Sequence, residues 1–323
     1  MKIEGSRILV TGGCGLIGST TIDLLLKDHA PDRVIILDNL ERGNMNNIEA
    51  ALRDPRVTFV HGDIRNADQV RQVCNGTDAV IHLAAQRITA CADYPRAAME
   101  VMGNGSFNVI EASHLAGVKK IIAASSASIY GLAGAFPTPE DHHPYNNRTW
   151  YGATKVMLEG LLRSFNDMNG LPYVALRYFN VYGPRMDIHG RYTEVLIRWM
   201  ERLENGQSPL IFGDGKQTMD FVHVADIARA NLMALQSDIS DDVFNVASGR
   251  ETSLNDLASL LSRVMGSGLP PEYAPERSVN PVPRRLADTS KARSLLGFRA
   301  TISLEEGLDQ LVKWWRSSRN QTR

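Results

Sequence analysis

The sequence is poor in the features that mark specialised classes of protein. Its 323 residues include three cysteines, and Cys14, Cys74 and Cys91 have no metal-type spacing, so we expect neither a disulfide framework nor a metal site. No apolar run approaches the roughly 20 residues of a membrane span, and the N-terminal residues lack the apolar core of a signal peptide. We therefore expect a cytoplasmic protein with no membrane partner.

Net charge is also nearly absent. The chain carries 35 basic and 36 acidic side chains, a formal charge of -1, so no overall field favours nucleic acid or an anionic membrane surface. What the chain does have is ordinary for a globular protein: 43% apolar and 22% charged residues. Its length is enough for about two domains with an extensive core.

Short apolar runs rich in β-branched residues alternate with helical stretches through the first half of the chain. Near-continuous apolar strands separated by helices are typical of a parallel sheet covered on both faces. We therefore predict an α/β fold with a doubly wound parallel sheet, the Rossmann arrangement. The expected strands are Arg7 to Val10, Arg33 to Leu37, Val57 to Val60, Ala79 to Leu83, Lys120 to Ala124 and Tyr173 to Arg177.

A glycine-rich turn follows the first expected strand. Gly12, Gly15 and Gly18 recur at three-residue intervals, with Leu16 and Ile17 between the last two, ahead of a helix. Glycines there bring the main chain close to a diphosphate, and free N–H groups at the helix start face its negative charge. An ordinary strand-to-helix connection has a similar composition, so the turn by itself is weak evidence for a nucleotide site.

Asp38 and Asn39 end the second expected strand, twenty residues after Gly18. An acidic residue there accepts hydrogen bonds from both adenosine ribose hydroxyls and repels a 2′-phosphate, which favours NAD over NADP. Nearby Arg42 is the one feature against this preference. Alone, Asp38 is better explained as a turn residue or as the cap of the next helix. Together with the glycine turn it predicts bound NAD.

The ends of the third and fourth expected strands extend the same site. Asp63 and Ile64 follow the third strand, where a carboxylate can reach the adenine amino group. Leu83, Ala84 and Ala85 follow the fourth. Small residues there let the cofactor lie flat over the strand ends, where ligands of open α/β sheets bind.

Three serines follow the fifth expected strand, Ser125, Ser126 and Ser128. Buried hydroxyls are costly unless they find partners, and a ligand over the strand end supplies one. Turn and capping chemistry is the alternative, and it suits Ser125 and Ser128 better than Ser126.

Tyr151 and Lys155 open a later helix and, being four residues apart, project from one face of it. A phenol must lose roughly three pKa units, about 4 kcal/mol, to act as a base near neutral pH. One ammonium at about 4 Å supplies that order of energy at an effective dielectric of about 20, and an oxidised nicotinamide adds positive charge. The pair with bound NAD therefore makes a coherent base, provided that the fold brings them together.

The ordered set of motifs resembles the extended short-chain dehydrogenase/reductase superfamily, specifically its nucleotide-sugar epimerase and dehydratase branch. The resemblance covers nearly the whole chain. Besides the residues above, it rests on Ile129-Tyr130-Gly131, Arg177 to Arg185, Gly213-Asp214-Gly215, Asp220 to Asp226, Ala287-Asp288, Lys291-Ala292 and Leu295-Leu296-Gly297.

The resemblance implies roles for these residues. Tyr151 is expected to be the base on a sugar hydroxyl, and Ser126 its hydrogen-bonding helper. Lys155 is expected to bind the nicotinamide ribose and to lower the pKa of the tyrosine. Asn180 is expected to contact the substrate phosphate or sugar and Arg277 the diphosphate, although a solvated surface charge is the alternative for Arg277. The full expected substrate site comprises Ser126, Ser128, Asn180, Arg185, Arg191, Phe212, Arg277 and Arg285.

The resemblance also implies the domain organisation. Residues 1–178, with a returning segment at about 220–247, are expected to form the NAD-binding domain, and residues 179–219 and 248–323 a smaller, mixed α/β substrate domain. Within the latter we expect a loop over the substrate at Leu269 to Pro283 and a closing helix at Leu304 to Trp315. A homodimer through the helices around 97–115 and 151–168, and a role in polysaccharide biosynthesis, are further expectations.

The residues before Ile129 separate the reactions of this branch. Dehydratases usually carry Asp-Glu there and decarboxylases a Glu, because elimination or a further proton transfer needs a carboxyl group. Here the pair is Ala127-Ser128. This favours NAD-dependent 4-epimerisation of a UDP-hexose or UDP-hexuronate through a transient 4-keto intermediate. A dehydratase or decarboxylase with an unfamiliar acid/base is one alternative, and a non-catalytic NAD-binding regulator is another.

Two residues depart from the pattern of the branch. Met219 stands where relatives often place an arginine against the diphosphate, and Arg191, Lys216 or Arg277 could take over that contact. Arg285 lies where relatives place residues around the sugar ring. An arginine there would crowd an N-acetyl group and could pair with a uronic acid carboxylate, which favours UDP-glucuronate or UDP-glucose.

Overall fold

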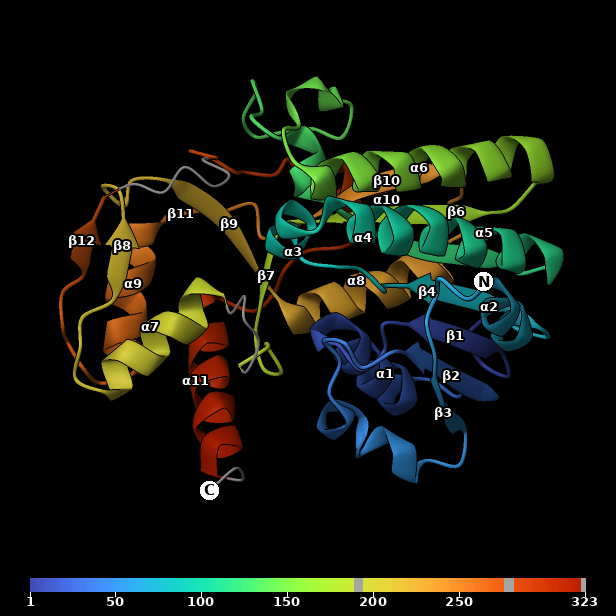
Figure 1. Ribbon diagram of the computed structural model, residues 1–323, viewed down its shortest axis with the longest axis horizontal. Helices are drawn as coiled ribbons and strands as arrows, with labels where there is room; N and C mark the ends of the chain where they lie inside the picture. The colour runs from blue at the N-terminus through green and yellow to red at the C-terminus, as the bar shows by residue number, and fades with distance from the viewer. Residues whose placement is uncertain (189–193, 276–281, 321–323) are drawn as a thin grey trace.

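A seven-stranded parallel sheet forms the larger of two lobes (Figure 1). The computed structural model describes residues 1–188, 194–275 and 282–320. The strand order is β3-β2-β1-β4-β5-β6-β10. Because the order reverses between β1 and β4, a crevice opens there at the carboxyl ends of the strands. The strands are β1 (Arg7–Thr11), β2 (Arg33–Asp38), β3 (Val57–His61), β4 (Ala79–His82), β5 (Lys120–Ser126), β6 (Tyr173–Tyr178) and β10 (Asp242–Val246).

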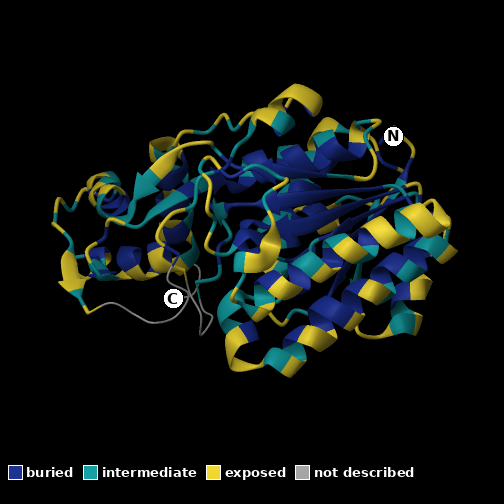
Figure 2. Ribbon diagram, turned by 90° about the horizontal axis from the view of Figure 1, so that it is seen from above, coloured by how far each residue is buried: buried dark blue, intermediate teal, exposed yellow. Residues whose placement is uncertain are grey.

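Helices cover both faces of this sheet, as Figure 2 shows by the buried strands between helices whose outer faces are exposed. In β1, Ile8 and Val10 pack on the side of α1 and α8, whereas Leu9 packs on the side of α2, α5 and α6. Successive strand side chains point to opposite faces, so an uninterrupted apolar strand needs helices on both. These helices are α1 (Leu16–Asp28), α2 (Ala67–Cys74), α5 (Ser106–Leu115), α6 (Trp150–Asn169) and α8 (Val224–Gln236).

The predicted doubly wound sheet is confirmed, and all six segments expected as strands form strands. The sheet also has a seventh strand, β10, which pairs with β6. Short helices and turns complete this lobe: η1 (Met45–Ile48), η2 (Ala51–Arg53), α3 (Ile88–Asp93), η4 (Ala127–Tyr130), η5 (Pro144–Asn146) and α10 (Ser290–Leu295).

The stretch from Ala97 to Leu115 is helical, as expected, but it is not one regular α-helix. A short helix, α4 (Pro95–Ala98), is followed by a π-helical segment, η3 (Met99–Gly105), before α5 begins. Glycine has a low propensity for the regular α-helix, and η3 contains Gly103 and Gly105. A Cβ atom on Gly105 would lie 2.7 Å from a side-chain carbon of Ile64, so the irregular segment passes close to the chain that follows β3.

The smaller lobe has an apolar core of its own, in which Trp199 and Trp315 are among the buried side chains. Strand β9 pairs in parallel with β7 and antiparallel with β11, and β8 pairs with β12, so its sheets are mixed. This agrees with the predicted smaller mixed α/β domain. Its elements are β7 (Asn180–Tyr182), α7 (Val195–Glu204), β8 (Leu210–Phe212), β9 (Thr218–His223), β11 (Glu251–Ser253), α9 (Leu254–Val264), β12 (Glu272–Ala274) and α11 (Leu304–Asn320).

Two expectations for this lobe need correction. The segment Leu269 to Pro283, expected as a loop, contains β12, whose residues bond to β8. The expected closing helix is α11, which begins at Leu304 as predicted but ends at Asn320 rather than at Trp315. Within the described part of the chain, no helix has the length and apolar character to cross a bilayer, and no cluster of His, Cys, Asp and Glu is placed to hold a metal ion.

Candidate active site

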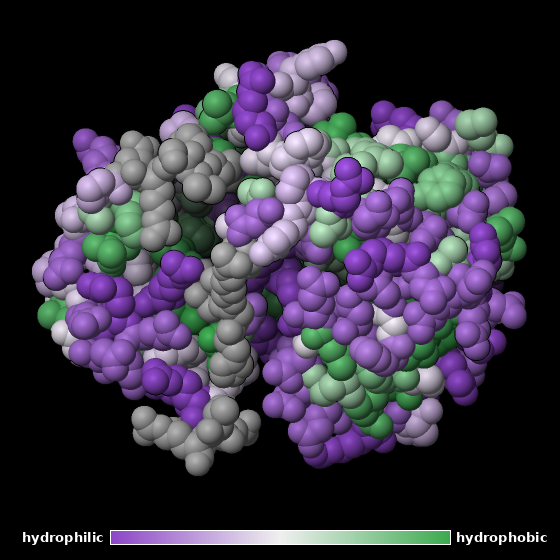
Figure 3. Space-filling view, viewed as in Figure 1, coloured by the Kyte–Doolittle hydropathy of each residue, from purple (hydrophilic) through white to green (hydrophobic). Residues whose placement is uncertain are grey.

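A cleft of about 970 Å³ opens at the point where the strand order reverses. Its walls come from the ends of β1, β2, β3 and β4 and, on the other side, from residues of α11, and Figure 3 shows the surface hollowed between the two lobes. Most of the residues predicted to bind the cofactor line it: Gly12, Gly15, Leu16, Ile17, Gly18, Asp38, Asn39, Asp63, Ile64, Leu83, Ala84 and Ala85.

Close backbone packing explains why the turn after β1 is rich in glycine. Gly12 has a φ of 70°, and a Cβ atom there would lie 2.8 Å from the backbone nitrogen of Ala84. A Cβ atom on Gly18 would lie 2.6 Å from the Cα of Gly13. Since neither position has room for a side chain, the turn lies directly on β4 and the start of α1 borders the cleft. Free N–H groups at a helix start suit an anionic diphosphate.

Asp38 is held rigidly at the end of β2 by two backbone N–H groups. Cys14 N donates to its Oδ2 at 2.9 Å and Leu40 N to its Oδ1 at 2.8 Å. A carboxylate has about four acceptor sites, so both oxygens keep capacity for the two hydroxyls of a ribose. The residues present therefore fit the diphosphate and the adenosine ribose of NAD.

Asp63 lies next to Asn39 on the same side of the cleft. Asn39 Nδ2 donates to its Oδ2 at 3.0 Å, and Arg65 binds the carboxylate through Nε at 3.0 Å and Nη2 at 2.7 Å. The Arg65 guanidinium is the main cause that holds the pKa of Asp63 at about 2. The carboxylate is therefore ionised at neutral pH, which makes both of its oxygens acceptors for an adenine amino group.

Arg42 lies in a charged cluster at the cleft that sequence reasoning missed. Arg87, which follows β4, pairs with Asp187 at 3.8 Å and with Glu194 at 3.5 Å. Burial and the neighbouring Arg87 lower the pKa of Arg42, and the two carboxylates oppose this. Arg42 is thus engaged with groups of the second lobe. No local signal in the sequence could have joined these positions.

Tyr151 reaches the end of β5 because α6 packs closely against the turn that follows this strand. Thr149 caps the helix by accepting from Gly152 N at 3.0 Å. A Cβ atom on Gly152 would lie 2.6 Å from the carbonyl oxygen of Ser128. This glycine lets the helix start approach the serine turn, and Ser126 in this turn is close enough to Tyr151 to lower the pKa of its phenol.

Lys155 is buried one turn further along α6. Its Nζ donates to the carbonyl of Ala124 at 2.6 Å and lies 5.6 Å from the centre of the Tyr151 ring. Burial lowers the pKa of Lys155 to about 8, so the ammonium form still predominates at neutral pH. The structure thus brings Ser126, Tyr151 and Lys155 together. These three are not among the residues that line the cleft, but Ala124, whose carbonyl accepts from Lys155, is.

The pKa of Tyr151 differs in direction from the sequence-based expectation. Burial raises it, while the hydrogen bond from Ser126 and the positive charges of Arg42 and Arg285 lower it. Desolvation of a phenolate inside the protein outweighs these groups. Lys155 is not among the groups that most affect the pKa of Tyr151, and Arg42 and Arg285 are not enough to lower that pKa below its usual value.

The serines after β5 divide their roles differently from the prediction. Ser126 Oγ, not Ser128, accepts from a backbone N–H and caps the turn, with Ser128 N as donor at 3.1 Å. Ser125 Oγ donates to Glu159 on α6. The correction follows from the strand's geometry, because alternate residues of β5 point to opposite faces.

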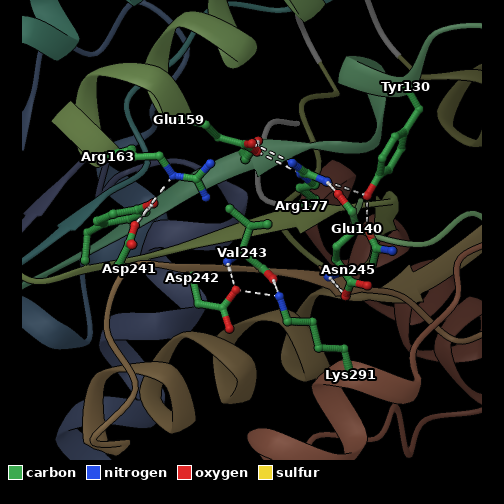
Figure 4. A network of polar contacts seen from close by, with 12 residues as sticks. Tyr130, Glu140, Glu159, Arg163, Arg177, Asp241, Asp242, Val243, Asn245 and Lys291 are labelled. Atoms are coloured by element: carbon green, nitrogen blue, oxygen red, sulfur yellow. Dashed lines mark hydrogen bonds and ion pairs between the residues drawn. The ribbon is translucent and has the colours of Figure 1, made fainter. Parts of the chain in front are cut away.

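A buried polar network lies beneath these residues (Figure 4). Arg177 of β6 binds Glu159 through Nε at 2.9 Å and Nη2 at 2.7 Å, and its Nη1 donates to Tyr130 OH at 2.8 Å. Tyr130 OH donates to Asn245 Oδ1 at 2.6 Å. The network ties α6, β6 and β10 to the turn after β5, and so fixes the helix that carries Tyr151.

The residues expected to bind substrate lie in several places. Asn180 Nδ2 donates to the carbonyl of Asp220 at 3.2 Å, at the start of β7. Arg185 forms an ion pair with Asp23 of α1 at 2.6 Å and lines the cofactor cleft. Phe212 is half-buried at the end of β8. Arg285 lies close enough to Tyr151 for the two charges to affect each other.

Arg191 and Arg277 lie outside the described residues. Lys216, the remaining candidate for the diphosphate, is an exposed side chain whose Nζ lies 3.6 Å from a carboxylate oxygen of Asp214. Met219 is half-buried in β9, directly before Asp220.

Comparison with known proteins agrees with this geometry. Residues 8–247 match the model of the NAD dependent epimerase/dehydratase family. A UDP-glucose 4-epimerase of Mycolicibacterium smegmatis is 36% identical over 315 residues, which cover 96% of this chain and 99% of the relative. The structure of a UDP-glucose 4-epimerase from Thermotoga maritima, solved with UDP-glucose, is 36% identical with a TM-score of 0.89, and the match covers 97% of this chain and 99% of that one.

A second solved structure is equally similar. A UDP-N-acetylglucosamine 4-epimerase from Methanobrevibacter ruminantium, in complex with UDP-N-acetylmuramic acid, has a TM-score of 0.91 and 34% identity, and the match covers 98% of this chain and 99% of that one. The family match confirms the predicted superfamily and its cofactor, NAD. The chain is a member of the NAD dependent epimerase/dehydratase family.

Proposed function

We propose that this protein is an NAD-dependent 4-epimerase of a UDP-hexose or UDP-hexuronate. The observation that carries the choice of reaction is the turn η4, which packs against the start of α6 where Tyr151 lies. The two residues before Ile129 in this turn are Ala127 and Ser128, and neither carries a carboxyl group. Dehydration and decarboxylation need a further acid/base at this place, whereas epimerisation needs one base that gives and takes a single proton.

The chain's own groups account for the proton. Tyr151 takes the proton of the sugar 4-hydroxyl and later returns it, with Ser126 as hydrogen-bonding partner. Bound NAD supplies reversible hydride exchange at C4, so that a 4-keto sugar forms and can be reduced on its opposite face. We assign Lys155 to the nicotinamide ribose, and its hydrogen bond to the carbonyl of Ala124, a residue that lines the cleft, supports this assignment. Since burial raises the pKa of Tyr151, the positive charge of the oxidised nicotinamide is needed to lower it.

The test is product identity. The purified protein is incubated, without added NAD, with a panel of UDP-, dTDP- and GDP-sugars, and the products are followed by chromatography and mass. We expect a product of unchanged mass from a UDP-sugar, because epimerisation conserves mass. Loss of water or of carbon dioxide would indicate a dehydratase or a decarboxylase instead.

Removing the phenol tests the assigned base. Tyr151→Phe should lower turnover by about 1,000-fold or more with little change in NAD content, since a positioned base contributes on the order of 100- to 10,000-fold. NAD content is read from the absorbance of cofactor released on denaturation. Near-normal turnover in this variant would contradict the assignment, and turnover lost together with bound NAD would indicate a misfolded site.

We also infer that the smaller lobe, at 179–219 and 248–323, binds the sugar nucleotide and that the protein is a cytoplasmic homodimer serving polysaccharide biosynthesis. Exposed apolar side chains on η3, α5 and α6 support the dimer: Met99, Phe107, Leu115, Met157 and Met168. Sedimentation velocity tests it. We expect the wild type to sediment as a dimer and Met157→Asp to sediment as a monomer. A monomeric wild-type protein would contradict the proposal.

A further inference from the structure

A short segment that follows β7 forms part of the wall of the cofactor cleft. Residues 185–188, which we call the strap, all line the cleft together with the glycine turn. Their side chains alternate in direction. Met186 is buried in the apolar core of the smaller lobe and Ile188 packs against that core, whereas Arg185 and Asp187 form ion pairs with the larger lobe. The strap therefore joins the two lobes beside the cofactor.

Two ion pairs attach the strap to the larger lobe. Nη2 of Arg185 lies 2.6 Å from Oδ2 of Asp23 on α1, and Nη2 of Arg87, which follows β4, lies 3.8 Å from Oδ2 of Asp187. The side chains of the shorter pair, Arg185 and Asp23, are 23% and 40% exposed. Water and salt screen a partly buried pair less than a fully exposed one, so the shorter pair holds its two partners more firmly than an ordinary surface pair does.

The backbone of Arg185 has an unfavourable conformation. Its φ is 75°, in the left-handed region that residues with a side chain seldom adopt. Such a conformation costs free energy and persists only where the surrounding structure fixes it. The contacts that fix it here include the ion pair with Asp23 and the burial of the next side chain, Met186. Loss of the ion pair therefore removes a contact that opposes this strain, and it frees the strap to move from the cleft.

Asp23 itself lies outside the cleft. Helix α1 begins at Leu16, which lines the cleft, and Asp23 lies about two turns further along the helix and is not among the lining residues. Its carboxylate contacts the strap through Arg185. An effect of Asp23 on a molecule in the cleft therefore has to pass through Arg185.

We propose that Asp23 is a positioning residue for the cofactor. Through Arg185 it holds the strap at the cleft, and bound NAD leaves the protein only after this ion pair has opened. The diphosphate and ribose sites described above belong to the larger lobe, and the strap adds a contribution of the smaller lobe to the retention of NAD. The proposal goes beyond the proposed function, because it concerns the exchange of the cofactor and not the reaction on a sugar.

The experiment measures how fast the protein releases NAD. Protein charged with radiolabelled NAD is mixed with an excess of unlabelled NAD, without any sugar, and the label that stays bound is followed with time. Asp23→Asn should release NAD on the order of tenfold faster than the wild type, between the small effect of an exposed pair and the larger effect of a buried one. The control is Asp28→Asn, at the exposed last residue of the same helix, and it should release NAD at the rate of the wild type.

Two further measurements test the ion pair itself. The charge swap Asp23→Arg/Arg185→Asp restores a pair of opposite charges, and aspartate tolerates the left-handed conformation at position 185 better than most residues do. The swap should therefore release NAD more slowly than Asp23→Asn. Raising the salt concentration from about 0.05 to 0.5 M should accelerate release more in the wild type than in Asp23→Asn, because salt screens a partly exposed pair that the variant lacks.

Two results would overturn the proposal: an Asp23→Asn variant that releases NAD no faster than Asp28→Asn, or a charge swap that releases NAD as fast as Asp23→Asn. The free energy of unfolding of the same proteins separates positioning from a general loss of stability. Positioning predicts faster release from a variant that is about as stable as the wild type, and release rates that only follow stability would refute it. Because no sugar is present, a failure of the 4-epimerase assignment leaves these outcomes unchanged.

Discussion

The buried ion pair between Arg177 and Glu159 provides the strictest test of how the active-site helix is held. The two side chains are 9% and 14% exposed and meet in a bidentate contact. Removing one partner of such a pair leaves a buried charge without compensation, which typically costs about 3–5 kcal/mol. We therefore expect Arg177→Met to lower the free energy of unfolding by that amount, equivalent to about 4–7 °C in Tm for a chain of this length.

A surface pair on the same chain is the matched control. Arg53 and Glu49 also meet at 2.7 Å, but their side chains are 76% and 68% exposed. Water and side-chain entropy reduce such pairs to about 0.5 kcal/mol or less. Arg53→Met should therefore hardly change the free energy of unfolding, although the contact that it removes is as short as the contact between Nη2 of Arg177 and Oε2 of Glu159.

Urea unfolding followed by circular dichroism measures both variants, together with Glu159→Leu and the double variant Arg177→Met/Glu159→Leu. Because the second substitution removes the charge that the first left unpaired, the double variant should lose about 2–3 kcal/mol less than the two single losses added together. The reasoning is refuted if Arg177→Met loses no more stability than Arg53→Met, or if the two single losses simply add.

Three further predictions concern the cofactor turn, its specificity and a buried lysine. Gly18→Ala should abolish NAD retention and lower Tm, because the new Cβ would lie 2.6 Å from the Cα of Gly13. The control Gly160→Ala, whose Cβ would have nothing within 4 Å, should leave the protein unchanged or stabilise it by about 0.5–1 kcal/mol. Equal effects of the two substitutions would contradict the prediction. Asp38→Ser should shift the ratio of NAD to NADP affinity by about tenfold or more toward NADP, measured by titration of the stripped protein, and an unchanged ratio would contradict the assigned ribose contact. Burial lowers the pKa of Lys120 to about 8, so between about pH 8 and 10.5 the unfolded chain binds this proton more strongly than the folded chain does. The free energy of unfolding of the wild type, relative to that of Lys120→Met, should therefore rise by about 1.4 kcal/mol per pH unit in this range. Urea titrations at several pH values measure this difference, and a difference that does not change with pH would contradict the prediction.

The local parts of the cofactor site could be predicted because each depends on neighbouring residues. The glycine turn and the strand end at Asp38 combine a short motif with a strand position, and parallel strands bring their carboxyl ends to one edge of a sheet. Tyr151 and Lys155 share a helix face for the same local reason. These patterns depend on backbone periodicity, which can be read without knowing the tertiary contacts.

The contacts that join distant segments could not be predicted in this way. The backbone of Arg285 is held by Thr218 of β9, and Arg177 meets Glu159 because β6 lies next to the helix packed on it. The pairing of β10 with β6 likewise depends on the chain returning from the smaller lobe. No sequence spacing contains this information, since many arrangements of the later segments would preserve the same local patterns.

The sequence by itself therefore determined the doubly wound sheet, the glycine-rich turn after its first strand, and the pairing of a phenol with an amine four residues later on one helix face. Only the tertiary structure decided the electrostatics of that phenol. Burial raises the pKa of Tyr151 against the effects of Ser126, Arg42 and Arg285. Desolvation depends on everything packed around a group, and the three groups that oppose it, one hydroxyl and two cations, come from separate parts of the chain.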